Sequence, residues 1–209
     1  MLTGDLRIEP VTPGHVPALD ELFSRGDPRN CQCAFLRMSA DDFDVADPVA
    51  RRDIHLQAIR AAHRSGTKAG QIALDDHGPV GWVSLGPRSD FPRLEHTRLI
   101  TATVADVPAV AGELWSVVCF VIATRARRRG VATALLQAVV DWAGNQQIGV
   151  LEGYPVDTDG QKRPGAALWH GTVGLFERAG FEVVARYREP SSATGRAIVR
   201  LTLPTCQPQ

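Results

Sequence analysis

The chain has 209 residues, of which 44% are hydrophobic and 22% charged, a composition typical of globular proteins and not of disordered ones. Its 23 Lys and Arg residues balance its 23 Asp and Glu residues, so no net positive field attracts the chain to nucleic acid or to an anionic membrane surface. No apolar run reaches 18 residues, and residues 1–5 have neither the basic nor the apolar part of a signal peptide, so we expect a cytoplasmic protein.

The first part of the chain predicts a strand followed by two helices. Residues 6–11 alternate apolar and polar side chains, which is typical of a strand with one buried face. Thr12 and Pro13 begin a helix that extends to Phe23, because proline is tolerated in the first turn of a helix. An acidic loop over residues 41–47 separates this helix from the next one.

The second helix is amphipathic, and a β-hairpin follows it. Gly66 ends the helix, and two short apolar runs at residues 69–74 and 80–85 flank a turn that contains Gly and Pro. The apolar face of the helix consists of Ile54, Ala58, Ala61 and Ala62.

The middle of the chain predicts a loop, a buried strand and a long helix. Residues 88–112 lack a clear period, and loops of this length inside a domain are often functional. Residues 114–122 are almost all apolar, which is typical of a strand buried on both faces of a sheet. After Gly130, apolar residues recur at helical spacing, namely Val131, Leu135, Ala138, Val139 and Trp142.

The last part of the chain predicts a strand, a helix and a final strand pair. Residues 148–154 form the strand, the helix ends at Gly180, and residues 181–188 and 197–203 pair across a turn rich in Ser and Gly. The order of elements is then β-α-α-β-β-β-α-β-α-β-β, which predicts a mixed sheet covered by helices. The sequence shows no internal repeat and no linker, so we expect one domain.

The four cysteines do not form a metal-binding pattern. Cys31 and Cys33 form a C-x-C pair without a second pair or a His cluster nearby, so a tetrahedral zinc site would lack half of its ligands. Cys119 lies in the apolar strand and is typical of a small core residue, and Cys206 is close to the end of the chain. We expect reduced thiols and no metal; a position of Cys31 and Cys33 near a substrate pocket stays open.

A basic turn lies between the buried strand and the long helix, where residues 125–132 read RARRRGVA. Such a cluster can be a solvated surface, a nucleic-acid patch or an anion site. The position favours the anion site, because backbone N–H groups at a helix N-terminus are unpaired and the helix dipole attracts negative charge. Gly130 and Ala132 are small enough to let the backbone approach a phosphate. Because neither G-x-x-x-x-G-K-[ST] nor G-x-G-x-x-G occurs, the turn predicts a pyrophosphate site of another kind.

Residues 120–132 resemble the acetyl-CoA signature of the GNAT superfamily of N-acetyltransferases, whose core, [Arg/Gln]-x-x-Gly-x-[Gly/Ala], is matched by residues 127–132. The order of elements is similar over residues 5–204, and residues 176–181 are similar to the late helix of the family and its Gly-Phe exit. The resemblance implies an α/β fold of the α+β type in a single N-acetyltransferase domain. Its mixed, centrally splayed β-sheet would have about seven strands flanked by about four helices.

The resemblance also implies acetyl-CoA as co-substrate and no metal. Pantetheine would lie in the gap of the splayed sheet and pair with the backbone like an added strand, and the pyrophosphate would bind to the backbone amides of the basic turn. The residues implied in cofactor binding are Phe120, Val121, Ile122, Arg127, Arg128, Arg129, Gly130, Val131, Ala132 and Thr133.

The implied reaction is direct transfer of an acetyl group from the thioester to a primary amine, promoted mainly by near-attack geometry. An amine with a pKa of about 10 needs a base or a desolvating site to free its lone pair. Glu152, which interrupts an apolar strand, is our first candidate for the base, and Glu113 is the second. The alternative for Glu152 is a carboxylate that pairs with an arginine or ends the strand.

The acid that protonates the leaving thiolate is usually a Tyr in the late helix of the family, and Phe176 stands at that position. We predict that Tyr154 replaces it; a proton from water, or a core role for Tyr154 with its hydroxyl bonded, are the alternatives. Trp169 and His170 are candidates for the wall of the acceptor pocket.

We therefore predict an acetyl-CoA-dependent N-acetyltransferase, an acyltransferase that acts on an amine of a small molecule or a protein. The missing Tyr keeps open a second function, a non-catalytic acyl-CoA-binding or regulatory module. We expect no membrane partner and no nucleic acid, because two Tyr in the whole chain offer no platform for stacked bases. Homodimers are common among the proteins that the chain resembles, and the sequence leaves the oligomeric state open.

Overall fold

A single twisted sheet carries the fold, and we describe it from a computed structural model in which residues 6–103, 105, 107–110, 112–190, 192 and 194–204 are placed. Its strands are β1 (Arg7–Pro10), β2 (Gly70–Asp75), β3 (Gly78–Pro87), β4 (Leu114–Ile122), β5 (Val150–Gly153), β6 (Val156–Asp157), β7 (Glu182–Tyr187) and β8 (Gly195–Thr202).

The strands follow the order β1-β2-β3-β4-β5-β8, and β7 pairs with the other edge of β8. Every pairing is antiparallel except that of β4 with β5, which is parallel. The two-residue strand β6 pairs with the same edge of β8 as β5 does, but nearer to the beginning of β8. The mixed sheet that the order of elements predicts is therefore confirmed.

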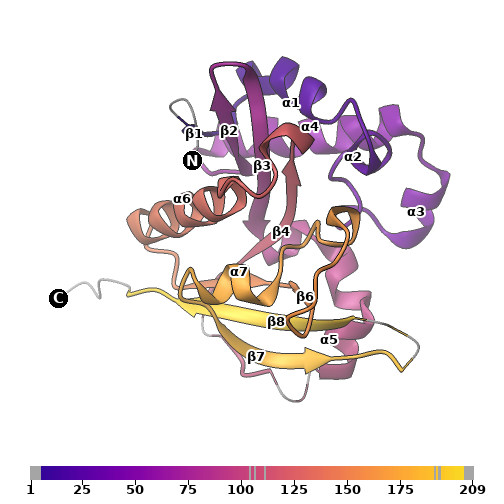
Figure 1. Ribbon diagram of the computed structural model, residues 1–209, viewed down its shortest axis with the longest axis vertical. Coiled ribbons are helices and arrows are strands. Elements are labelled where there is room, and N and C mark those ends of the chain that lie inside the picture. The colour runs from indigo at the N-terminus through magenta and orange to yellow at the C-terminus, as the bar shows by residue number, and fades with distance from the viewer. Residues whose placement is uncertain are drawn as a thin grey trace.

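The sheet splays between its two parallel strands. Residues 114–117 of β4 pair with residues 150–153 of β5, and the pairing stops there although β4 continues to Ile122. In Figure 1, β2 to β4 run nearly vertically through the upper half of the molecule, whereas β7 and β8 cross the lower half nearly horizontally. The central splay that the resemblance implies is present.

Helices cover both faces of the sheet (Figure 1). One core joins the sheet to α6 and α7, and the other joins it to α1, α4 and α5. The helices are α1 (Val16–Leu22), α2 (Asp27–Cys31), α3 (Ala40–Val45), α4 (Pro48–Ser65), α5 (Arg98–Thr103), α6 (Val131–Asn145) and α7 (Val173–Glu177). None of the helices within the described residues is long and apolar enough to cross a membrane.

Two segments that the sequence predicts as loops are partly helical. The acidic segment forms α3, because Ser39 caps the helix by accepting a hydrogen bond from the Asp42 N–H (3.1 Å) and two aspartates stand in its first turn. The segment over residues 88–112 contains two short 3-10 helices and α5. These elements raise the number of helices above the predicted four.

The buried face of α4 also differs from the predicted one. His55, Leu56 and Ile59 are the buried residues of this helix, whereas Ala61 is exposed. The His55 ring stacks on Phe23, with ring centroids 5.5 Å apart. Of the predicted face, Ala62 packs against the core and Ala61 does not. The prediction missed the centre of the buried face because it passed over a histidine that packs as an aromatic ring.

Candidate functional site

Beyond Val117, β5 no longer pairs with β4. We call this edge of β4, opposite to the one that pairs with β3, the open edge, because no strand of the described residues pairs with it there, although other residues contact it. The Phe120 N–H donates to the Trp169 carbonyl (2.6 Å), and His170 Nδ1 lies 2.7 Å from the Val118 carbonyl oxygen. Because a carbonyl can only accept, Nδ1 carries the hydrogen in this contact. The Trp169–His170 segment thus lies along the edge that the sequence assigns to pantetheine.

Of the predicted pantetheine residues, Phe120 and Ile122 direct backbone groups to this edge. The Ile122 carbonyl accepts a hydrogen bond from Arg127 Nε (3.4 Å). Val121 stands opposite Trp82 in the antiparallel register, and the alternation along a strand turns its backbone groups toward β3. Backbone groups of two of the three residues therefore face this edge, and their binding of pantetheine stays a prediction.

The basic turn leads into α6 with a backbone suited to an anion. Gly130 is the N-cap at φ 84°, Arg128 has φ 62°, and no described heavy atom lies within 4 Å of a Cβ built on Gly130. The first bond of the helix runs from the Ala134 N–H to the Gly130 carbonyl (3.0 Å), so the amides from Val131 to Thr133 have no acceptor within the helix. This open surface of N–H groups fits a pyrophosphate.

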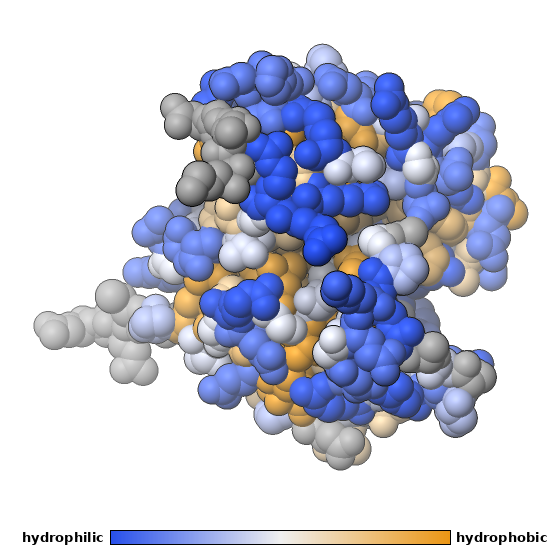
Figure 2. Space-filling model, viewed as in Figure 1, coloured by the Kyte–Doolittle hydropathy of each residue, from blue (hydrophilic) through white to orange (hydrophobic). Residues whose placement is uncertain are grey.

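The arginines of the turn point in different directions. Arg125 forms a two-fold ion pair with Asp75 (2.5 and 3.0 Å) and lowers the pKa of that carboxyl, so it serves the fold. Arg127 lies against Gly165, where an added Cβ would be 3.4 Å from the guanidinium. Figure 2 shows hydrophilic side chains over much of this face, with apolar atoms between α6 and α7.

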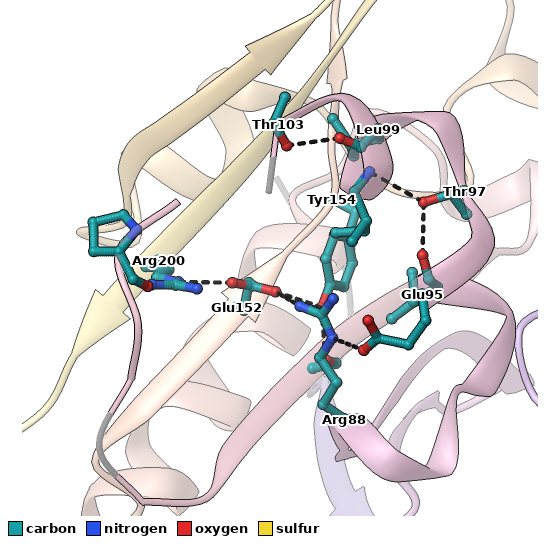
Figure 3. Close-up of polar contacts among 12 residues, drawn as sticks. Arg88, Glu95, Thr97, Leu99, Thr103, Glu152, Tyr154 and Arg200 are labelled. Atoms are coloured by element: carbon teal, nitrogen blue, oxygen red, sulfur yellow. Dashed lines mark hydrogen bonds and ion pairs between the residues drawn. The ribbon is translucent and has the colours of Figure 1, made fainter. Parts of the chain in front are cut away.

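Glu152 lies at the centre of a buried polar cluster (Figure 3). Its side chain is fully buried, and its Oε1 accepts from Arg88 Nη1 (2.5 Å) and from the Tyr154 hydroxyl (2.7 Å). Its Oε2 accepts from Arg200 Nε (2.6 Å). These contacts match the alternative that the sequence left open, a carboxylate paired with arginine; the role of Glu152 as a base stays a prediction.

The Tyr154 hydroxyl connects this carboxylate to Ser116, in the part of β4 that pairs with β5. Because its hydrogen is donated to Glu152, the Ser116 hydroxyl, 2.8 Å away, is the donor in the second contact. Burial, and then the charge of Glu152, raise the pKa of Tyr154 well above its ordinary value. Tyr154 is therefore held protonated, and its role as an acid stays a prediction.

A cavity of about 230 Å³ opens beside Tyr154, on the face of the sheet that α5 covers. Trp169 and His170 line it; their role in binding the acceptor stays a prediction. Burial, and then the charge of Arg196, hold the pKa of His170 well below its ordinary value, so its ring is neutral. The other lining residues are Phe35, Leu36, Leu94, Thr97, Arg98, Leu99, Tyr187, Glu189, Ser192, Thr194 and Arg196.

Two other candidates from the sequence lie away from the cavity. Phe176 is completely buried and packs so closely on Gly153 that a Cβ there would be 2.4 Å from its ring. Glu113 accepts a hydrogen bond from Trp115 Nε1 (2.8 Å) at the beginning of β4, the end opposite to the open edge. Neither side chain lines the cavity.

The thiols pack as core residues. The Cys33 and Cys119 sulfurs are 3.4 Å apart in the interior, and Cys31 is half-buried at the end of α2. Cys206 lies outside the described residues. Within the ranges that the structure describes, no group of three or more His, Cys, Asp or Glu side chains is placed to hold a metal ion.

Sequence reasoning missed Arg196 and Arg200. Both belong to β8 and stand on one face of it, because strand residues two and four apart point to the same side. The signal was present as basic residues in an otherwise apolar strand, around Ile198. It went unused because a terminal strand is usually taken as half-exposed.

Known proteins connect this geometry to a family. The model of the protein family described as "Acetyltransferase (GNAT) family" matches residues 34–181. No curated protein matches the chain in sequence. The chain is similar in structure to a GCN5-related N-acetyltransferase from Kribbella flavida, at 20% identity and a TM-score of 0.52, over 95% of this chain and 98% of that one.

Two further solved structures show the same fold. The ribosomal-protein-S5-alanine acetyltransferase from Vibrio fischeri has 10% identity and a TM-score of 0.58, over 97% of this chain and 96% of that one. A chain of the NatC complex, solved with a Gag peptide and CoA, has 12% identity and a TM-score of 0.54, over 96% and 99%. The family match over most of the chain, together with the splayed sheet, shows that this protein belongs to the GNAT acetyltransferase family.

Proposed function

We propose that this protein transfers an acetyl group from acetyl-CoA to a primary amine, as one domain over residues 5–204 and in the cytoplasm. The observation that carries the proposal is the open edge of β4 beside the N-terminus of α6. Membership of the family supports it, as does the CoA in the NatC structure. Acetyl-CoA supplies the acetyl group as an activated thioester.

The residues of the basic turn fit a diphosphate. The backbone amides from Arg128 to Thr133 would bind it, with Gly130 giving the close approach. The backbone of Phe120 and Ile122 would bind the pantetheine arm. Since the Phe120 N–H now donates to Trp169, binding at this position exchanges one hydrogen bond for another.

The acceptor would enter from the opposite face of the sheet. The cavity lies on the α5 face, whereas α6 and α7 cover the other face. Tyr154 and His170 belong to the cavity wall and also contact β4, through Ser116 and Val118. An amine in the cavity would therefore meet a thioester at the gap in the sheet, in the near-attack arrangement that the reaction needs.

Two side chains are candidates for the base. Glu152 is enclosed by two guanidinium groups and a phenol, so a proton would reach it through the Tyr154 hydroxyl. Because Glu113, the second candidate from the sequence, does not line the cavity, we propose His170 in its place. The His170 Nδ1–H is bonded to Val118 and its Nε2 keeps a lone pair. For the acid, Tyr154 is our proposal and water the alternative.

The alternative function, a non-catalytic acyl-CoA-binding module, is favoured by one observation. Phe176 replaces the usual Tyr and is packed in the core without access to the cavity. A thiol-release assay with a broad panel of amines separates the two functions. We expect CoA release with at least one amine, and binding of acetyl-CoA without release across the panel would favour the module.

The anion site has a matched control. Gly130→Val places a side chain in the open approach, whereas Gly66→Val does so at the C-cap of α4, where φ is 72° and the space is equally free. Both variants carry the same backbone strain, about 1–2 kcal/mol. We expect Gly130→Val alone to lose affinity for CoA in calorimetry; equal affinities would contradict the pyrophosphate assignment.

A further inference from the structure

Arg196 places an unpaired guanidinium at the wall of the cavity. It stands at the beginning of β8, between Tyr187 of β7 and Val156 of β6, and its side chain is half-buried. No described side chain forms an ion pair or a hydrogen bond with its guanidinium. Burial alone lowers the pKa of Arg196 to about 10, which leaves it charged at neutral pH.

The neighbouring arginines are all paired, which makes Arg196 an exception. Arg186 pairs with Asp157 and Arg188 with Asp159, and Arg200 pairs with Glu152. A partly buried charge without a partner is costly, because it has lost water and gained no counter-charge. An anion that enters the cavity would supply the missing partner.

The one carboxylate of the cavity wall is engaged elsewhere. Glu189 forms an ion pair with Arg98 at the rim, where the Arg98 side chain is 71% exposed. The His170 ring, which also lines the cavity, is neutral and donates to the backbone. Among the described residues of the wall, no carboxylate therefore pairs with the Arg196 guanidinium.

The wall also contains apolar side chains, and the space is small. The apolar members are Phe35, Leu36, Leu94, Leu99 and Trp169, beside the hydroxyl groups of Thr97, Ser192 and Thr194. The volume of about 230 Å³ is below the range of roughly 300–1,000 Å³ that holds drug-sized ligands. The occupant is therefore of about the size of one amino acid.

We infer that the acceptor is a small amine that carries a carboxylate and an apolar group, of the size and chemistry of an apolar α-amino acid, with its carboxylate bound by Arg196. This rests on the proposed function and names the substrate class of the same site. A guanidinium binds a carboxylate through two parallel hydrogen bonds, which also fixes the orientation of the amine. The same charge repels polyamines and other polycations.

The test uses amines that differ only in the carboxylate. Leucine is compared with 3-methylbutylamine, which lacks the carboxylate, and with leucinamide, in which it is neutral. CoA release gives KM and kcat, and calorimetry with the full chain in the presence of CoA gives binding without turnover. The variants are Arg196→Gln and Arg196→Lys, with Arg188→Gln as the control, because Arg188 is paired and does not line the cavity.

We expect leucine to bind tighter than either analogue. Arg196→Gln should weaken leucine binding roughly 10- to 100-fold, as for loss of a charged hydrogen bond, and should leave 3-methylbutylamine and CoA unaffected. Arg196→Lys should recover part of the loss, and Arg188→Gln should bind like the original protein.

Equal binding of leucine and 3-methylbutylamine, or an Arg196→Gln variant that binds leucine normally, would overturn the inference. Failure of the proposed function has a different signature. In that case leucine binds in an Arg196-dependent manner but no CoA is released, so the inference about the ligand holds and the transfer reaction does not.

Discussion

Replacing Glu152 by Gln should destabilise the fold strongly. The substitution keeps the shape of the side chain but removes the negative charge that faces both Arg88 and Arg200. It also replaces one of the two accepting oxygens by an NH2 group, which cannot accept a hydrogen bond from an arginine. Breaking a buried ion pair by removing one partner costs about 3–5 kcal/mol. For a chain of this length, that loss lowers the Tm by roughly 6–20 °C.

The control for this variant is Glu95→Gln, which acts on the same arginine from outside. Glu95 accepts from Arg88 Nε (2.9 Å), but its side chain is 57% exposed whereas that of Glu152 is fully buried. An exposed pair contributes about 1 kcal/mol or less. Urea unfolding of both variants, with unchanged m-values, measures the difference; equal losses would refute the role of burial.

The same variant separates the structural role of Glu152 from a catalytic one. Activity is measured well below the Tm of the variant, so that both proteins are folded. A base that titrates with pH gives kcat/KM an acidic limb. If Glu152 is the base, Glu152→Gln removes this limb; if His170 is the base, the limb persists and is lost in His170→Gln.

Three further predictions concern stability. Gly153→Ala brings a Cβ to 2.4 Å from the Phe176 ring, so we expect a loss of about 1–3 kcal/mol in urea unfolding. Burial lowers the pKa of His55 to about 3, so the unfolded chain binds the extra proton below its own pKa of about 6.5. The free energy of unfolding should therefore fall as the pH drops from about 6.5 to about 3, and less steeply in His55→Leu. Arg125 lowers the pKa of Asp75, so Asp75→Asn should be less stable at neutral pH and should match the original protein at acid pH, where the carboxyl is protonated.

The sequence predicts those parts of the fold that depend on neighbouring residues. Two short apolar runs predict the strands of the hairpin, which lie at residues 70–75 and 78–87, and Gly66 predicts the end of α4. The strand, the basic turn and the helix around the proposed anion site are predictable for the same reason, because they are contiguous in the chain. Short helices such as α3 lack enough turns to show a period.

The cavity could not be predicted as a whole, because its wall comes from segments far apart in the chain. Residues near 35, 95, 154, 170 and 196 meet only when the sheet is assembled. The pairing of Glu152 with Arg88 spans 64 residues, and that with Arg200 spans 48. No local pattern encodes such partners, so the sequence could name Glu152 as unusual but could not choose between a base and an ion pair.

The Trp169–His170 segment has a consequence for the binding of the two substrates. Its backbone contacts β4 at Phe120, and its side chains line the cavity on the other side. A ligand that accepts the Phe120 N–H in place of the Trp169 carbonyl therefore also moves one wall of the acceptor site. The affinity for acetyl-CoA and the affinity for the amine then change each other by the same factor. Under the proposed function, acetyl-CoA moves that wall as it binds, so the affinity for the amine should differ between the free protein and its complex with CoA.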